Sequence, residues 1–468
     1  MSQRLHNVAP PGSLAARDLD ALFHPSTNLA LHERVGPSVL QSGSGVRVRD
    51  PEGKEYIEAM SGLWCTALGY GNEELAEVAA EQMRTLAYGH LFGGRSHEPA
   101  IALAEKLKAM VPIDDGRVFF GSSGSDANDT QVKLVRYYNN ALGRPRKKKI
   151  ISRWKGYHGV TLAAGSLTGL PPFHAHFDLP MEGVFHVSAP HYRRNAEPGE
   201  TEAQFVTRLA DELEQLILRE DPETVAAFIA EPVQGAGGVI VPPAGYFEAI
   251  QAVLDRYDVL LIADEVICGF GRTGQPFGSQ TFAMRPDTMS LAKALSSAYL
   301  PISAVVVPGR MFEAIAEQSG EVGVFGHGYT YSGHPVCAAV ANRVLEIYER
   351  TDLFAHAARM SVRFQERLHA LGEHPLVGEV RGVGLIGAVE LEADRDAKAP
   401  FDPKAAIGMF CAKRAEAHGV IVRPLGDSLA FCPPLVITEP DIDEVFDRFA
   451  LALEDTLAHV REHGLLRG

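Results

Sequence analysis

The chain has 468 residues, of which 46% are hydrophobic and 22% are charged, and its formal net charge at pH 7 is −15. A chain of this length and composition can bury the cores of two or three globular domains. The acidic balance argues against a nucleic acid or an anionic membrane as a partner, because both attract basic surfaces.

The cysteines and the hydropathy pattern indicate the cellular setting. The five cysteines are scattered and include no C-x-x-C pair, so we expect no disulfide framework. The N-terminus lacks the apolar core of a signal peptide, and no run of 18 apolar residues could span a membrane. These features predict a cytoplasmic protein with no membrane partner.

The N-terminal part of the chain is predicted to contain short strands and then helices. Residues 1 to about 20 are expected to be loosely ordered, and residues 43–62 form short alternating strands around a D-P-E-G turn. Residues 72–86 and 99–111 have the apolar spacing of helices. Residues 117–143 indicate a buried strand, a Gly/Ser loop and a helix that Ser125 or Asp126 could cap.

The middle of the chain repeats one pattern, in which a short apolar run ends in a polar or Gly-rich loop. Helical segments lie between several of these runs. Strands that alternate with helices predict a mostly parallel α/β sheet, and ligands of such sheets bind at the carboxyl ends of the strands. The runs lie within residues 147–159, 225–238, 259–271, 285–297 and 300–309.

The last part of the chain has a different pattern. From about Ser332, a long helix, a hairpin-like segment, and then a helix, strands and a helix indicate an α+β domain. We therefore predict a large α/β domain over residues 71–331 and a small α+β domain over residues 332–468. Residues 1–70 are predicted to join the small domain, because both ends of the chain lack the βα alternation.

Three features near predicted strand ends point to one ligand. Lys293 lies among small and apolar residues, where an ammonium group is costly unless it is paired or neutralised. Asp264 ends the apolar run "VLLIA", and "GSSGSDAN" leads into a helix N-terminus that suits a phosphate. The alternatives are an exposed lysine, a loop-capping aspartate and a simple capped turn. Pyridoxal phosphate would use all three, through its aldehyde, its ring nitrogen and its phosphate.

A second cofactor must be weighed against pyridoxal phosphate. The segment "GFGRTG", with Gly269, Gly271 and Gly274, matches the G-x-G-x-x-G fingerprint of dinucleotide-binding proteins. However, "DEVIC" separates it from the preceding strand, and no convincing helix follows it. A nicotinamide-dependent dehydrogenase is therefore the weaker hypothesis.

Several long motifs, in order along the chain, resemble those of a known family. The chain resembles the class III aminotransferases, pyridoxal-phosphate enzymes of fold type I, from about Leu22 to Leu453. Within that family, "GLWC", "HGYTYSGHP" and "VIVRPLGDSLAFCPPLVIT" are most similar to the ω-amino acid and amine:pyruvate aminotransferases. The motifs that carry the family resemblance are "GLWCTALGYG", "FFGSSGSDAND", "GYHG", "AFIAEPVQGAGGVIVPP", "LLIADEVICGFGRTG", "LAKALSS", "HGYTYSGHP" and "RGVGL".

The resemblance implies roles for residues around the cofactor. Lys293 bonds to the cofactor and later moves a proton, and Asp264 keeps the ring nitrogen protonated. Val266 packs on one face of the ring and Tyr157 on the other. The resemblance further implies that the phosphate is held by Ser123, Gly124 and Ser125, and that Glu231 and Gln234 lie along the polar side of the cofactor.

The resemblance also implies a substrate pocket and an assembly. Trp64 and Phe92 shape the pocket, and Arg423 binds the carboxylate of pyruvate or alanine. Thr330 reaches the phosphate of the neighbouring subunit, which implies a homodimer or a dimer of dimers. The expected reaction is a ping-pong amino transfer from a terminal amine or ω-amino acid to pyruvate. The same fold also carries aminomutases and decarboxylases, which stay open as alternatives.

Three alanines are informative against the family pattern. Relatives that act on 4-aminobutyrate or ornithine have a glutamate at the place of Ala236, where it holds the arginine when no α-carboxylate is bound. Its absence favours the amine:pyruvate branch. Ala294 and Ala298 stand where the family usually has glycine, and we expect their methyl groups to affect the shape of the pocket.

Overall fold

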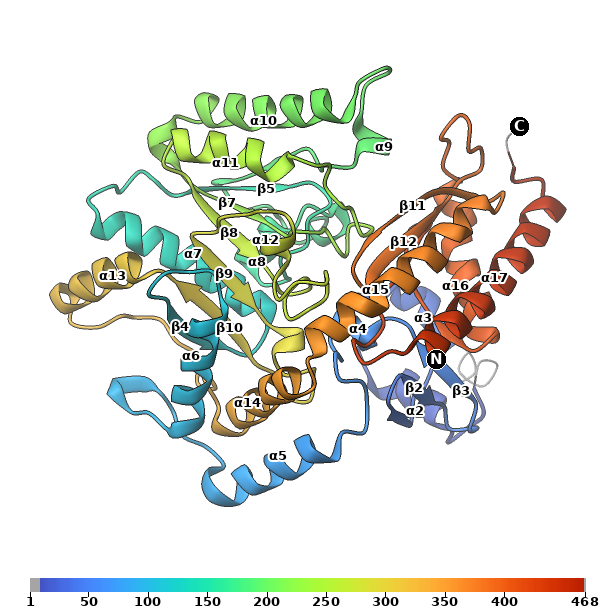
Figure 1. Ribbon diagram of the computed structural model, residues 1–468, viewed down its shortest axis with the longest axis horizontal. Helices are drawn as coiled ribbons and strands as arrows, with labels where there is room; N and C mark the ends of the chain where they lie inside the picture. Colours follow the sequence, from blue (N-terminus) through green and yellow to red (C-terminus); the bar gives the residue numbers. More distant parts are fainter. Residues whose placement is uncertain (1–8, 467–468) are drawn as a thin grey trace.

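The computed structural model of the protein describes residues 9–466. A large sheet flanked by helices forms one side of the molecule, and the N-terminal strands lie with the C-terminal elements on the other side (Figure 1). Among the described residues, no helix combines the length and the apolar character needed to cross a membrane. Both the α/β class and the mostly parallel sheet predicted from the sequence are confirmed.

The large sheet has seven strands in the order β4-β10-β9-β8-β7-β5-β6. Only β10 runs antiparallel to its neighbours, β4 and β9. The strands are β4 (Arg117–Gly121), β5 (Lys149–Arg153), β6 (Val184–Val187), β7 (Val225–Ala230), β8 (Leu260–Asp264), β9 (Thr288–Leu291) and β10 (Ser303–Val307).

Helices cover both faces of this sheet, which is why its central strands are apolar along their whole length. Every residue of β7 and β8 is buried. Phe228 of β7 packs in the apolar core on one face, while Ala227 and Ile229 pack in the core on the other. One core contains residues of α7 (Gly124–Ala141) and α13 (Gly309–Val322). The other contains residues of α10 (Glu202–Arg219) and α11 (Tyr246–Arg256).

Six further helices belong to this part of the molecule. Helix α14 (Pro335–Arg350) packs against α5 (Glu73–Leu86) and α6 (Glu98–Met110). The remaining helices of this part are α8 (Leu162–Leu167), α9 (Tyr192–Asn195) and α12 (Gly278–Thr281).

Two four-stranded sheets and three long helices make up the other side of the molecule. The strand order is β1-β2-β3-β13 in the first sheet and β11-β12-β15-β14 in the second. The strands are β1 (Ser42–Ser44), β2 (Arg47–Arg49), β3 (Glu55–Glu58), β11 (Val377–Val383), β12 (Ile386–Leu391), β13 (Val420–Ile421), β14 (Arg423–Leu425) and β15 (Ser428–Phe431). The helices are α15 (Leu353–Ala370), α16 (Ile407–Ala417) and α17 (Glu439–Glu462).

The two ends of the chain meet in the first of these sheets. Strand β3 pairs in parallel with β13, with Ile57 opposite Val420. This pairing places β3 beside a C-terminal strand, while the assignment of residues 1–70 to a small domain and the domain boundaries at residues 71 and 332 stay predictions.

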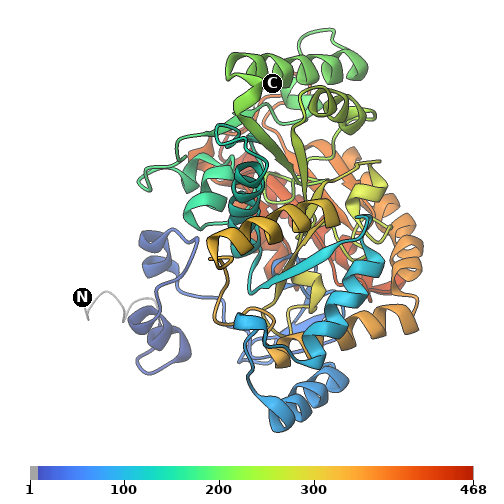
Figure 2. The ribbon, with the colours of Figure 1, turned by 90° about the vertical axis from the view of Figure 1, so that its left-hand side faces the viewer.

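The N-terminal segment is more ordered than the sequence suggested. The expectation of a loose segment over residues 1–20 is wrong for α2 (Leu14–Ala21), which begins at a Ser13 cap and is followed by α3 (Leu29–Val35). The first eight residues lie outside the described part. Figure 2 shows these two helices, in dark blue, at the edge of the molecule, and Figure 1 labels them on the side of β2 and β3. Helix α4 (Ser61–Trp64) then leads toward that sheet.

Ala298 has a backbone conformation that is unfavourable for alanine. Its φ is +62°, in the left-handed region, where a Cβ costs roughly 1–2 kcal/mol. Part of that cost is offset, because an unfolded chain with alanine at this position has less conformational entropy to lose on folding than one with glycine. We expect Ala298→Gly to raise the free energy of unfolding by about 0.5–1 kcal/mol, measured by urea denaturation.

A matched control for this prediction lies in α13. Ala316 is exposed and helical, so Ala316→Gly should lower the free energy of unfolding by about 0.5–1 kcal/mol. Equal destabilisation by the two glycines would show that the backbone of Ala298 is not strained.

Candidate active site

A cavity of about 580 Å³ lies at the carboxyl ends of the parallel strands. Asp264 is the last residue of β8, Glu231 directly follows β7, and Lys293 follows β9 by two residues. All three line the cavity, together with the first residues of α7. This is the place where ligands bind in open α/β sheets, so the strand topology brings together the groups that the sequence singled out.

Lys293 extends from a strained backbone into this cavity. Its φ is +51°, which is uncommon for a residue with a side chain. Two hydrogen bonds hold the turn, because the Lys293 carbonyl accepts from the Ser296 N–H at 3.2 Å and from the Ala298 N–H at 3.3 Å. Strained residues of this kind persist only where the surroundings fix them, and they cluster at active sites.

Asp264 is buried and is fixed by two donors that sequence reasoning missed. Its Oδ2 accepts a hydrogen bond from Asn128 Nδ2 at 2.7 Å and faces His158 Nδ1 at 2.8 Å. Its Oδ1 accepts from the Val266 N–H at 3.1 Å. The carboxylate is only 3% exposed, and a buried carboxylate needs such donors or a cation.

The N-terminus of α7 faces the same cavity. Gly124 and Ser125 line it and belong to the first turn, whose backbone N–H groups lack partners within the helix. Ser123 is the N-cap residue, and its Oγ accepts from the Asp126 N–H at 3.2 Å. Of the two expected caps, Ser125 makes no capping bond, whereas Asp126 completes the cap by accepting from the Ser123 N–H at 3.0 Å. Ser123 does not line the cavity, so a direct contact between its hydroxyl and a phosphate there is not supported.

Glu231 and Gln234, which both follow β7, differ in their position relative to the cavity. Glu231 lines the cavity, and its carboxylate accepts from the N–H groups of Tyr157 at 2.9 Å and Gly235 at 3.0 Å. Burial raises the pKa of Glu231. Gln234 does not line the cavity, because its Nε2 donates to the Trp154 carbonyl at 3.0 Å. Gln234 therefore stabilises the loop behind the site.

Apolar and aromatic side chains enclose the space between these polar groups. Val266 and Tyr157 both line the cavity. A Cβ at Gly124 would lie 3.0 Å from Val266 Cγ1, so glycine lets the helix start lie close to this side chain without displacing it. Ala294 lies in the main apolar core and does not line the cavity, so the effect of its methyl group on the shape of the pocket stays a prediction.

Trp64 and Arg423 also line the cavity. Trp64 is 3% exposed and belongs to α4. The buried carboxylate of Glu58 fixes this segment by accepting from the Met60 N–H at 3.1 Å and the Gly62 N–H at 2.5 Å. Burial raises the pKa of Glu58 to about 7.

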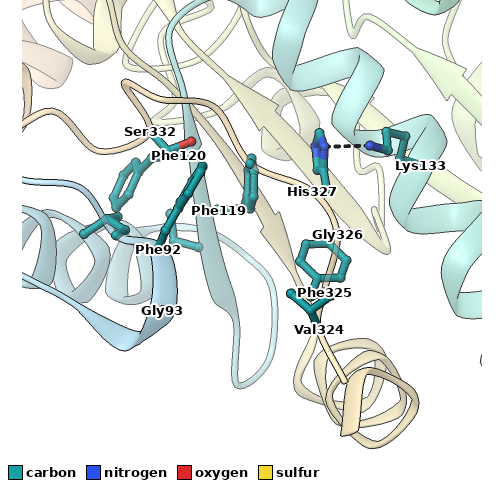
Figure 3. A pocket seen from close by; sticks show the side chains of 13 residues that line it. Phe92, Gly93, Phe119, Phe120, Lys133, Val324, Phe325, Gly326, His327 and Ser332 are labelled. Atoms are coloured by element: carbon teal, nitrogen blue, oxygen red, sulfur yellow. Dashed lines mark hydrogen bonds between the residues drawn. The ribbon is translucent and has the colours of Figure 1, made fainter. Parts of the chain in front are cut away.

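Phe92 and Thr330 do not line the cavity of their own chain. Phe92 is half exposed and lies in a second pocket of about 730 Å³, near Phe119 and Ser332 (Figure 3). Thr330 is also exposed, and its carbonyl accepts from the Tyr88 hydroxyl at 2.7 Å. The sequence-based roles of these two residues therefore cannot be performed within a single chain.

The glycine-rich segment does not form a dinucleotide site. A helix should begin at the third glycine of the fingerprint. Residues 266–273 form turns and residues 274–277 form bends, and the helix that follows, α12, has only four residues. The Gly271 backbone is in the left-handed region at φ +97° and packs close to Phe354.

The cavity fits pyridoxal phosphate by the chemistry of its groups. Asp264 offers a buried carboxylate to a protonated ring nitrogen, and Lys293 offers an amine to an aldehyde. The first turn of α7 offers N–H groups to a phosphate. Gly159, at φ +133°, lets the next loop approach that turn, since a Cβ there would lie 2.6 Å from Ser125 Oγ.

Comparison with known proteins gives one consistent family. Residues 30–453 match the model of the class III aminotransferases. Gamma aminobutyrate transaminase 3, chloroplastic, of Solanum lycopersicum is 50% identical over 427 residues, which cover 91% of this chain and 82% of the relative. The diaminobutyrate–2-oxoglutarate transaminase of Halomonas elongata is 46% identical over 461 residues, which cover 97% of this chain and 98% of the relative.

A solved structure agrees with these relatives. The ω-transaminase of Pseudomonas jessenii in complex with PMP is 54% identical and superposes with a TM-score of 0.95. The match covers 96% of this chain and 99% of that chain. The chain therefore belongs to the class III aminotransferases, pyridoxal-phosphate-dependent enzymes of fold type I.

Proposed function

We propose that the protein transfers the amino group of a terminal amine or ω-amino acid to pyruvate, giving alanine. The position of Arg423 in the cavity is the observation that supports pyruvate as the acceptor. Arg423 supplies the only guanidinium among the described residues that line the cavity, and no carboxylate of the described chain pairs with it. Burial lowers the pKa of Arg423, but an arginine keeps its charge at neutral pH. It is therefore free to bind a substrate carboxylate.

One guanidinium suits an acceptor with one carboxylate. A dicarboxylate such as 2-oxoglutarate carries a second charge that would need another cation in a largely apolar space. Ala236 also lines the cavity and offers no charge to Arg423. These features favour pyruvate. The Halomonas relative is named for 2-oxoglutarate, which makes that keto acid the competing acceptor.

The donor class is supported by the relatives and by the lining of the cavity. The tomato relative is named for gamma-aminobutyrate, whose amine is terminal, and the Pseudomonas protein is named an ω-transaminase. The apolar side chains of Leu63, Trp64 and Phe173 line the cavity and suit a donor whose amine stands at the end of an apolar chain.

The chemical roles follow from the positions of the groups. When bound, pyridoxal phosphate supplies an aldehyde for the amino group and a ring that accepts electrons. Lys293 is the base that removes a proton from the amine-bearing carbon of the donor and returns one to the carbon of the acceptor. Asp264 holds a proton on the ring nitrogen. The donor leaves as a carbonyl compound before pyruvate enters the same cavity, which is a ping-pong order.

A second copy of the chain completes the site in this proposal. Phe92 and Thr330 are exposed outside the cavity of their own chain, so each copy would supply them to the cavity of its partner. The protein would then have the mass of two chains, or a multiple of it, in solution.

The experiment that tests the function is a panel of donors crossed with two acceptors. Purified enzyme is incubated with gamma-aminobutyrate, β-alanine, a diamine and an arylalkyl amine, each with pyruvate or 2-oxoglutarate. We expect alanine to form faster than glutamate, and parallel lines in double-reciprocal plots. Faster glutamate formation would contradict the acceptor, and no product from any donor would contradict amino transfer.

Arg423→Lys should weaken the acceptor more than the donor. A lysine keeps the charge but loses the bidentate pair with a carboxylate, which is worth about 1.5–3 kcal/mol. We therefore expect KM for pyruvate to rise by about 10–100-fold, while the KM of an arylalkyl amine without a carboxylate changes little. Steady-state kinetics with each substrate varied in turn measures both. An equal rise for the two substrates would assign Arg423 to the shape of the pocket.

A further inference from the structure

The N-terminal helices α2 and α3 bring three metal-ligating side chains together at the edge of the molecule. Asp18 lies on α2, His32 lies on α3, and His24 lies in the loop between them. His24 Nε2 is 2.9 Å from Asp18 Oδ1, and His32 Nε2 is 3.2 Å from the same oxygen. The two imidazole rings lie 4.2 Å apart. Two imidazole nitrogens and one carboxylate thus lie close together.

The spacing of these atoms suits a tetrahedral metal ion. In a tetrahedral zinc site the ligand atoms lie about 2.0–2.1 Å from the metal, and hence about 3.3 Å from one another. One ligand atom from each residue lies within 4.8 Å of the other two, so small side-chain movements would reach this geometry. The side chains are only 14% (Asp18), 12% (His32) and 27% (His24) exposed, which leaves room for one water ligand.

We propose that Asp18, His24 and His32 bind one divalent transition-metal ion, for which Zn²⁺ is the best match. Imidazole and carboxylate ligands suit Zn²⁺ and Co²⁺, whereas Ca²⁺ and Mg²⁺ prefer sets made of oxygen alone. Each imidazole would coordinate through the Nε2 lone pair, with its proton on Nδ1. No electron is transferred, and the bound ion replaces the hydrogen bonds that the carboxylate accepts in its absence.

The position of this site connects it to the active-site cavity. Pro25 and Ser26 directly follow His24 and line that cavity. Ser26 is in the left-handed region at φ +49°, and the Thr27 hydroxyl donates to the Pro25 carbonyl at 2.9 Å. A bound ion would tie the loop from residue 22 to residue 28 to both helices. It would therefore fix one wall of the cavity without touching the reacting groups.

The test uses tag-free holoenzyme in a buffer without phosphate, chelator or amine substrate. Calorimetric titration with Zn²⁺ should give one ion per chain, and Co²⁺ should give the intense visible absorption of a tetrahedral complex. Hydrogen exchange of the backbone amides in residues 22–28 should slow when Zn²⁺ is added. His24→Ala and Asp18→Asn should each raise the Kd for Zn²⁺ by at least about tenfold.

A histidine pair elsewhere in the chain provides the matched control. The rings of His459 and His463 also lie 4.2 Å apart, but no carboxylate within residues 9–466 bonds to both of them. His463→Ala should leave the Kd and the stoichiometry unchanged. Thermal unfolding of each variant without metal shows whether the fold is retained. Equal Kd values for the native chain, His24→Ala and Asp18→Asn would overturn the proposal, as would binding that is lost in His463→Ala.

Discussion

Lys293→Ala should lower kcat for amino transfer by about 10⁴-fold or more, because the variant lacks both the amine that bonds the cofactor and the base that moves the proton. The side chain points into the cavity, so its removal should leave the apolar core intact. Alanine formation from pyruvate and the best donor measures the loss. In the native protein, borohydride reduction followed by mass spectrometry should find the cofactor on the peptide that contains Lys293.

The control for this variant is a lysine outside the cavity. Lys413 is 61% exposed and pairs with Glu416 on the surface of α16, so Lys413→Ala should retain full activity. Circular dichroism and thermal unfolding should be the same for the two variants. More than a tenth of the native activity in Lys293→Ala, or a modified peptide at another lysine, would refute the assignment.

Asp264→Asn should lower kcat/KM by about 10³-fold, equivalent to about 4 kcal/mol of transition-state stabilisation. Asparagine has nearly the same shape and can still accept from Asn128 and His158. It cannot supply the negative charge that keeps a proton on the ring nitrogen, so the ring becomes a weaker electron acceptor. The rate of the half-reaction with the donor alone, followed by the absorbance of the bound cofactor, isolates this step.

A second, partly buried aspartate separates the charge effect from a packing effect. Asp287 precedes β9, at the end of the sheet away from the cavity, and its carboxylate accepts from the Leu261 N–H at 2.9 Å. Asp287→Asn should change kcat/KM by less than about threefold. If both variants lost activity equally, the loss would come from the sheet and not from the charge at the ring.

The main part of the fold could be predicted because short apolar runs typical of buried strands alternate along the chain with the apolar spacing of helices. Strands β7 and β8 are continuous apolar runs, and the helices between strands have clear apolar faces. Helices α13 and α15 were not predicted. Pro308, which precedes α13, has no capping side chain, so the usual start signal is missing there. Asp352, which precedes α15, is of a type that caps helices, but its side chain makes no capping bond.

The candidate site could be predicted only in part. Asp264 and Lys293 follow apolar runs and were therefore visible in the sequence. Asn128 and His158 reach Asp264 from a helix and a loop that are distant in sequence, and no local pattern marks such a contact. Ser123 stands in the expected motif, but its hydroxyl caps a helix. Motif membership identifies the segment, while the direction of each side chain depends on tertiary packing.

The pairing of β3 with β13 has a consequence for synthesis on the ribosome. Ile57 emerges early from the exit tunnel but finds Val420 only when nearly the whole chain has been made. The large sheet needs neither strand and can form first, as domains generally do during translation. Until then, one edge of β3 stays unpaired, which is the kind of surface that aggregates. The last fifty residues of the chain therefore protect its beginning.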